Sequence, residues 1–208
     1  MDDGRNDGMD LGHPMHPFDV ETLTVGRWRN GGGATREVAV RPADTGGDDF
    51  GWRASIADID ADGLFSAFPG VDRTLTLLAG DGVRLTCPGV FDQRLTGVGE
   101  PFAFSGDLSL AAELPGGPCR VLNIMVRRGR WEARVKGVHG PVAPPSGHAG
   151  LLYVRHGRWQ AGAGGRVLEP GQGVWWDGGG GGAAPGEAAI VPLSPEAAAL
   201  WADISPVG

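Results

Sequence analysis

The segment TLTLLAGDG, residues 74–82, contains the element from which we expect the whole fold to be built. Threonine and leucine alternate, which is typical of a β-strand with one buried face, and Gly-Asp-Gly then marks a tight turn. The segment GLLYVRHG, residues 150–157, has the same order of apolar strand and closing glycine. Because strand-and-turn segments follow both copies, at 101–107 and 168–174, we predict two copies of one β unit.

Runs of alternating apolar and polar residues continue along most of the chain, and glycine-rich turns separate them. Glycine makes up 38 of the 208 residues without a Gly-X-Y period, which excludes a collagen-like chain and indicates many turns. The clearest helical features lie in 194–201, where Ser194 suits the N-cap and Pro195 the first helical position. We therefore predict an all-β fold with very little helix.

The charge balance and the apolar pattern exclude two classes of partner. The 18 basic and 25 acidic residues give a formal net charge of −7 at pH 7, whereas a general nucleic-acid binder is basic. No apolar run approaches the ~20 residues of a membrane span. The basic stretch 127–136 contains a turn signal at Arg128-Gly129 and an acidic Glu132, so we interpret it as a solvated hairpin. We expect no nucleic acid and no membrane among the partners.

The N-terminus and the cysteines indicate a cytoplasmic protein. Residues 1–17 are small, polar and acidic and lack the apolar core of a secretory signal, so we expect a disordered leader. Cys87 and Cys119 are the only cysteines. A disulfide between them is an open alternative, but without an export signal we favour two reduced thiols that pack as small apolar residues.

Four motifs in the first part of the chain occur together and in order. They read WRNGGGATRE (28–37), FGWRASIA (50–57), DGLFSAFPGVDR (62–73) and NIM (123–125). In this combination the sequence resembles the HutD/Ves family, and its repeated strand-glycine-turn unit is similar to that of the cupin barrel. The second part of the chain carries little motif evidence.

The resemblance implies a bicupin, with two double-stranded β-helix (jelly-roll) barrels. On this interpretation residues 18–128 form the first barrel and residues 129–208 a second, degenerate one, and the protein is a homodimer. HutD members are encoded with the histidine-utilisation pathway and are thought to bind a small pathway carboxylate in a regulatory role; Ves relatives are associated with stress responses. We therefore expect a cytoplasmic, regulatory protein that binds a formylglutamate- or urocanate-like carboxylate, with no catalytic residue assigned.

Metal-binding cupins place two histidines and a glutamate at fixed distances before a closing glycine. If Gly80 is that glycine, Arg73 occupies the glutamate position, and Ser66 and Phe68 (or an alanine and a proline, one residue later) occupy the histidine positions. A cation repels a divalent metal, and the other side chains do not complete a ligand set. We therefore expect no metal and no other cofactor. Three later histidines are expected to be surface or hydrogen-bonded residues: His139, His148 and His156.

Strand alternation places a candidate anion site in the segment 50–57. A period of two puts Arg53 and Ser55 on one face of the strand and Trp52 and Ile56 on the other. In a barrel one of these faces is the lumen, and arginine offers a planar fork that matches a carboxylate. We therefore predict Arg53 as the carboxylate anchor and Ser55 as a polar contact.

Each candidate also has a structural alternative. Arg53 faces solvent or pairs with Asp58 or Glu37 if it is not the anchor. Arg73 is expected as a second cation, as part of a turn corner or as a residue paired to a neighbouring strand. Phe65 is expected as an apolar wall or as a lid over the core. For the run 30–33, the alternative to a backbone rim around an anion is a plain flexible loop. The remaining candidate contacts are Asn123, Ser66, Asn30, Gly31, Gly32 and Gly33.

Two other functions stay open. A metal-independent cupin enzyme acting on a similar small acid needs a general base in the cavity, for which Asp72, Asp107 and Glu37 are the candidates. A structural or stress-associated dimer would have a cavity that serves only packing.

Overall fold

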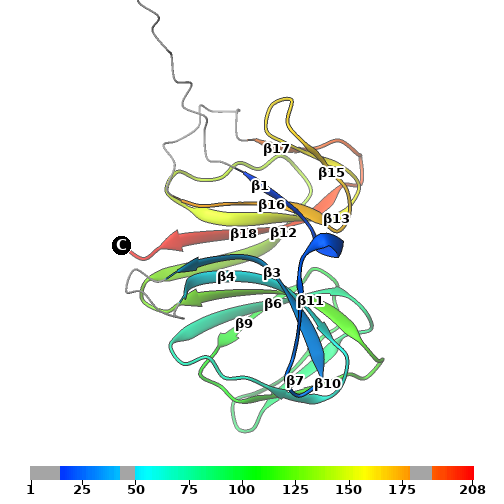
Figure 1. The fold of residues 1–208 in the computed structure, drawn as a ribbon, viewed down its shortest axis with the longest axis vertical. Coiled ribbons are helices and arrows are strands. Elements are labelled where there is room, and N and C mark those ends of the chain that lie inside the picture. The colour runs from blue at the N-terminus through cyan, green and yellow to red at the C-terminus, as the bar shows by residue number, and fades with distance from the viewer. Residues whose placement is uncertain (1–14, 43–49, 179–188) are drawn as a thin grey trace, which may run out of the picture.

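The structure is a computed structural model that describes residues 15–42, 50–178 and 189–208 (Figure 1). Strands account for nearly all of its regular structure. The described residues contain one helix, the three-residue 3-10 turn η1 (Val20–Thr22). The all-β prediction is therefore confirmed. Within these ranges no helix has the length and apolar character needed to cross a membrane.

The strands form four sheets, two large and two small. The six-stranded sheet has the order β2 (Val25–Arg27), β3 (Gly33–Pro42), β4 (Phe50–Ile59), β11 (Cys119–Arg127), β6 (Val71–Ala79) and β9 (Pro101–Ser105). The five-stranded sheet has the order β1 (His16–Asp19), β16 (Gln172–Trp176), β13 (Ala149–His156), β18 (Ala198–Pro206) and β12 (Trp131–Val138). The four-stranded sheet comprises β5 (Gly63–Phe65), β10 (Leu110–Glu113), β7 (Val83–Cys87) and β8 (Phe91–Leu95). The three-stranded sheet comprises β15 (Val167–Leu168), β14 (Trp159–Ala161) and β17 (Ile190–Pro192).

The two large sheets pack back to back through one shared core, and a smaller sheet covers the outer face of each (Figure 1). Trp52, Ala54 and Ile56 of β4 lie in the shared core with residues of the five-stranded sheet, among them Leu151 and Ala202. The alternation predicted for β4 is thus confirmed. Its opposite face is directed toward the four-stranded sheet.

The repeated unit predicted from the sequence is present in both halves of the molecule. β6 leads through Gly80 and Gly82 into β7, and β13 leads through Gly157 into β14. These three glycines have φ between 68° and 117°, a conformation that glycine adopts readily because it has no Cβ. In both copies the first strand lies in a large sheet and the second strand in the smaller sheet that covers it.

Two local predictions are wrong because tertiary pairing overrides local preference. The segment 194–201 is a turn followed by the start of β18, and β18 is buried between β13 and β12, which outweighs the helix propensity of its alanines. The stretch 127–136 is not a hairpin, because β11 and β12 belong to different sheets and the turn at Gly129 joins them. The boundary predicted at residue 128 falls at this turn, and the division into two barrels stays a prediction.

The chain end and the cysteines also test the sequence analysis. Residues 1–14 of the predicted leader lie outside the described residues, but its last two, His16 and Pro17, belong to β1, where the imidazole of His16 stacks on Trp175. The strand therefore begins before residue 18.

Cys87 and Cys119 are buried and free, as predicted. Burial, with a contribution from a nearby carboxylate, raises the pKa of Cys119 to about 11.

An ion-pair network joins the N-terminal segment to the six-stranded sheet. Asp58 of β4 accepts hydrogen bonds from Arg36 of β3 and from Arg120 of β11, whose Nε lies 2.6 Å from Oδ1. Arg120 also pairs with Glu21 of η1 at 3.0 Å. Burial by itself raises the pKa of Asp58, but the hydrogen bonds from Arg120 and Arg36 outweigh it and lower that pKa below its ordinary value.

We predict that Asp58→Asn lowers the free energy of unfolding at pH 7 by about 1–3 kcal/mol, because two arginines lose their charged acceptor. A carboxylate with a lowered folded-state pKa stabilises the protein above its unfolded pKa of about 4, and this contribution is lost as the pH falls through the folded value. Urea denaturation should therefore show a difference from wild type that shrinks between pH 5 and pH 3.

Asp92→Asn is the matched control, because Asp92 pairs with Arg84 at the exposed surface. Exposed ion pairs contribute little to stability, so this variant should have a free energy of unfolding close to that of the wild type at pH 5 and at pH 3. If the difference in the free energy of unfolding between Asp58→Asn and wild type does not change with pH, the stabilising role of the ionised Asp58 carboxylate is wrong.

Candidate functional site

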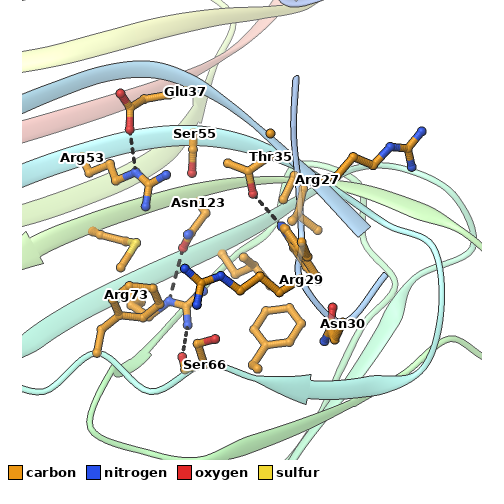
Figure 2. Close-up of a pocket in the computed structure, with 18 of the residues that line it drawn as sticks. Arg27, Arg29, Asn30, Thr35, Glu37, Arg53, Ser55, Ser66, Arg73 and Asn123 are labelled. Atoms are coloured by element: carbon orange, nitrogen blue, oxygen red, sulfur yellow. Dashed lines mark hydrogen bonds and ion pairs between the residues drawn. The ribbon is translucent and has the colours of Figure 1, made fainter. Parts of the chain in front are cut away.

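A cavity of about 770 Å³ lies between the outer face of the six-stranded sheet and two segments, 24–30 and 64–68 (Figure 2). This volume is typical of a small-molecule site. The cavity brings together seven of the ten predicted contacts, although they come from four separate motifs. These are Asn30, Arg53, Ser55, Phe65, Ser66, Arg73 and Asn123.

The register of three neighbouring strands builds the floor of the cavity. Met125 of β11 is the Cα partner of Arg53 on β4 and of Arg73 on β6. Asn123, two residues earlier on β11, is the partner of Ser55 on β4. Because residues two apart share a face of the sheet, the two arginines stand in one row across the strands, and the serine and asparagine stand in the next.

Arg73 is the buried charge of the cavity, with 6% of its surface exposed. Its Nε donates to Oδ1 of Asn123 at 3.5 Å, and a terminal nitrogen donates to the backbone oxygen of Ser66 at 3.3 Å. No carboxylate within the described ranges pairs with it. Burial, together with the positive charge of Arg53, lowers the pKa of Arg73 to about 10, so the guanidinium is still charged at neutral pH.

Aromatic rings surround this guanidinium. Its central carbon lies 5.5 Å from the ring centroid of Phe65, 5.3 Å from that of Phe68 and 5.2 Å from that of Phe104. Such contacts stabilise a cation only modestly, so the rings do not replace an ion partner. Phe65 therefore lines the cavity and also covers Arg73.

Arg53, the predicted anchor, has an acidic neighbour. Its Nε lies 3.1 Å from Oε2 of Glu37 on β3, which also lines the cavity. The approach is close enough for an ion pair but its angles are not those of a hydrogen bond, so the Nε–H has no acceptor among the residues that the structure describes. Asp58, the other partner considered, is engaged by other arginines. Arg53 thus lines the cavity, while Arg73 carries the charge without an acid partner.

Ser55 and Asn123 supply neutral hydrogen-bond donors beside the arginines. Their exposed fractions are 2% and 8%. Within the described part of the chain, neither the Ser55 hydroxyl nor the Asn123 Nδ2 group has a side-chain hydrogen bond. A guanidinium, an amide N–H and a hydroxyl therefore face one cavity, an arrangement that can accept the oxygens of a carboxylate.

The run 30–33 shapes a turn rather than a rim of the cavity. Oδ1 of Asn30 accepts a hydrogen bond from the backbone N–H of Gly32 at 3.0 Å, and Gly31 has a φ of 71°. A Cβ at Gly33 would lie 2.3 Å from the backbone oxygen of Asp58, so glycine allows β3 to approach β4. Asn30 lines the cavity, whereas the three glycines are not among its lining residues.

Two further arginines, Arg27 and Arg29, line the mouth of the cavity and were not predicted from the sequence. Arg27 is the last residue of the short edge strand β2, and Arg29 lies in the turn beyond it. No periodic pattern marks a buried face in this segment. Between them, Trp28 is anchored by its Nε1, which donates to Oγ1 of Thr35 at 2.8 Å. The two arginines that flank this tryptophan in the sequence were the available signal for a basic rim of the cavity.

Two of the three candidate bases lie outside the cavity lining. Asp72 and Asp107 both pair with Arg128, each at 2.7 Å. The hydrogen bond from Arg128, with a further one from the backbone of Gly70, lowers the pKa of Asp107 to about 2. The third candidate, Glu37, lines the cavity but is the ion partner of an arginine.

The residues of the cavity do not fit the divalent metal that many cupins hold. Ser66, Phe68 and Arg73 do converge on the cavity, but a guanidinium repels a metal cation and the other two offer no usable ligand set. Across the ranges that the structure describes, no group of three or more His, Cys, Asp or Glu side chains could hold a metal ion. The three later histidines form hydrogen bonds through Nδ1, as predicted: His139, His148 and His156.

Known proteins resemble this chain over most of its length. The family model HutD matches residues 20–190. Protein Ves of Cronobacter sakazakii is 39% identical over 163 residues, which cover 78% of this chain and 87% of the relative. Protein Ves of Citrobacter koseri is 38% identical over 192 residues, covering 92% and 94%.

Solved structures agree with this assignment. HutD from Pseudomonas fluorescens SBW25 (formate condition) has 26% identity and a TM-score of 0.75, and the match covers 94% of this chain and 100% of that one. A bacterial pirin from Escherichia coli in complex with nickel(II) has 12% identity and a TM-score of 0.60, covering 93% and 100%, and shows a likeness of fold alone. The fold is therefore cupin-like, and the chain belongs to the HutD/Ves family.

Proposed function

We propose that this protein binds a small carboxylate in the cavity, with Arg73 as the anchor and Arg53, Ser55 and Asn123 as further contacts. The observation that carries the proposal is the charge of Arg73, which is buried and has no acid partner among the described residues. A buried cation without a counter-ion is costly, so an anionic ligand would compensate it. Arg73 thereby takes the role that the sequence analysis assigned to Arg53.

The chemistry around Arg73 supports a carboxylate in particular. The planar guanidinium can donate to both carboxylate oxygens, and charge-assisted bonds of this kind are strong where water is scarce. The Ser55 hydroxyl and the Asn123 amide would donate to the remaining lone pairs. A volume of about 770 Å³ leaves room for an organic remainder, as in a formylglutamate- or urocanate-like ligand.

The setting of this site is part of the proposal. We place it in the first of two barrels of a bicupin, in a cytoplasmic homodimer with a regulatory role in histidine utilisation or the stress response. Membership of the HutD/Ves family supports this setting, as do the two layered halves of the fold.

Binding without turnover is the form of the proposal that the acids of the site favour. A general base must reach the substrate with a free lone pair. Asp72 and Asp107 are engaged by Arg128 outside the lining, and Glu37 is engaged by Arg53. The arrangement therefore favours a binding protein over a metal-independent enzyme.

A thermal-shift screen with acetate, formylglutamate and urocanate tests the proposal. A ligand at 100 times its dissociation constant adds ~2.7 kcal/mol of apparent stability, so a specific ligand raises the melting temperature in a saturable way. A response to formylglutamate or urocanate but not acetate would support the histidine-pathway role. No saturable response to any of the three would favour a cavity that serves only packing.

Arg73→Met should remove ligand binding without destabilising the free protein. Methionine fills much of the arginine volume and removes a buried charge that has no counter-ion, so the unliganded protein should unfold at or above the wild-type urea concentration. The carboxylate-induced thermal shift should disappear. Arg73→Lys keeps the charge but loses the two-point contact, and calorimetric titration should show binding weakened by ~1–3 kcal/mol.

Arg94→Met is the matched control, because Arg94 is exposed on β8, away from the cavity. It should bind carboxylates as the wild type does. Wild-type affinity in both Arg73 variants would overturn the assignment of the anchor. The lysine variant tests the same point if the methionine variant does not fold.

Glu37→Gln should strengthen carboxylate binding, because Glu37 competes with the ligand for Arg53. Exposed ion pairs contribute 0.2–1 kcal/mol, so the gain should be at most about fivefold in affinity. Arg53→Lys should weaken binding less than Arg73→Lys. Calorimetric titration of the three variants gives the order, and a larger loss in Arg53→Lys would return the anchor role to Arg53.

A further inference from the structure

The cavity concentrates positive charge in a protein that is negative overall. The chain has 25 acidic and 18 basic residues. The charged residues that line the cavity are instead four arginines and one glutamate, namely Arg27, Arg29, Arg53, Arg73 and Glu37. A cleft lined mainly by one sign of charge attracts ions of the opposite sign. The lining of the cavity therefore favours an approaching anion, although the net charge of the chain is negative.

Arg29 is the member of this set whose charge is free at the entrance. It is exposed, lies in the turn between β2 and β3, and Figure 2 shows its side chain extending from that turn into the cavity. No acid or hydrogen-bond acceptor of the described residues pairs with it. Arg27, two residues earlier, by contrast lies 3.6 Å from Asp60.

We infer that Arg29 is an anion-capture residue, which meets the incoming anion at the mouth of the cavity and raises its local concentration there. Arg73 then holds the anion in the interior. The identity of the held group as a carboxylate rests on the proposed function, whereas capture at the mouth concerns any small anion. Arg29 thus affects how fast the anion enters the cavity, and Arg73 affects how tightly it is held.

The size of the effect follows from the position of the charge in water. As an order of magnitude, a unit charge at about 7 Å contributes ~0.5 kcal/mol in bulk water, which is about a twofold change in local anion concentration. Salt at 1 M shortens the screening length to about 3 Å and removes most of this effect. A capture role is therefore recognised by its dependence on ionic strength, which a role in packing does not have.

The fluorescence of Trp28 provides a probe that needs no ligand. Trp28 is partly exposed, lines the cavity and directly precedes Arg29. Iodide quenches tryptophan by collision and is an anion, whereas acrylamide quenches by collision and is neutral. Quenching by both agents is measured for wild type, Arg29→Gln and the charge-matched control Arg94→Gln. Subtracting the signal of a Trp28→Phe variant gives the Trp28 component. If that variant does not fold, the total quenching of wild type, Arg29→Gln and Arg94→Gln is compared instead.

At an ionic strength of about 0.05 M, Arg29→Gln should lower the iodide quenching constant of Trp28 about twofold. The acrylamide constant should not change, Arg94→Gln should match the wild type, and the difference should vanish near 1 M potassium chloride. Equal iodide constants in Arg29→Gln and wild type would overturn the inference. So would an equal fall with acrylamide or in Arg94→Gln. Failure of carboxylate binding is judged separately, on the Arg73 variants.

Discussion

The back-to-back contact between the six-stranded and five-stranded sheets is the constraint on which the rest of the structure depends. It buries one face of β4 and β11 in a core that includes Trp52 and Ile56. Because side chains alternate along a strand, the odd-numbered residues of β4 and β11 must face the other way. Arg53 and Ser55 of β4 and Asn123 of β11 are thereby directed toward the four-stranded sheet. The apolar core thus orients the polar floor of the cavity.

The two halves use this common plan differently. Between the five-stranded and three-stranded sheets, Trp159, Trp176 and Trp201 fill the interior, and the rings of the last two lie 4.7 Å apart. In the other half the corresponding space holds Arg73 and a cavity of about 770 Å³. Burial of these large aromatic rings stabilises the packing between the five-stranded and three-stranded sheets. The half that contains the five-stranded sheet is thus filled by aromatic packing, whereas the half that contains the six-stranded sheet holds the cavity.

Arginine-carboxylate pairs around the cavity explain how Arg73 stays without a counter-ion in an acidic protein. Asp58 is held by Arg120, Asp72 and Asp107 are held by Arg128, and Glu37 is next to Arg53. Each nearby acid thus has another arginine as its partner. Among the described arginines that line the cavity, this distribution leaves the buried guanidinium of Arg73 and the exposed guanidinium of Arg29 without an acid partner.

Much of this architecture follows from local sequence patterns. Period-two alternation determined which face of β4 would carry Arg53, and the glycines at 80 and 157 marked the turns of the repeated unit, since positive φ there favours glycine. The alanine-rich segment 194–201 was misassigned for the opposite reason. Its place in the sheet depends on strands that are distant in sequence, and their pairing outweighs local propensity.

The sequence by itself determined which residue types the site contains and that they alternate with an apolar face. Only the tertiary structure decided which of two arginines is compensated. Met125 brings Arg53 and Arg73 into one row, but Glu37 on β3 reaches Arg53, and three aromatic rings close around Arg73. Local patterns cannot separate these cases, because the energy of a charge depends on its burial and on partners that come from distant segments.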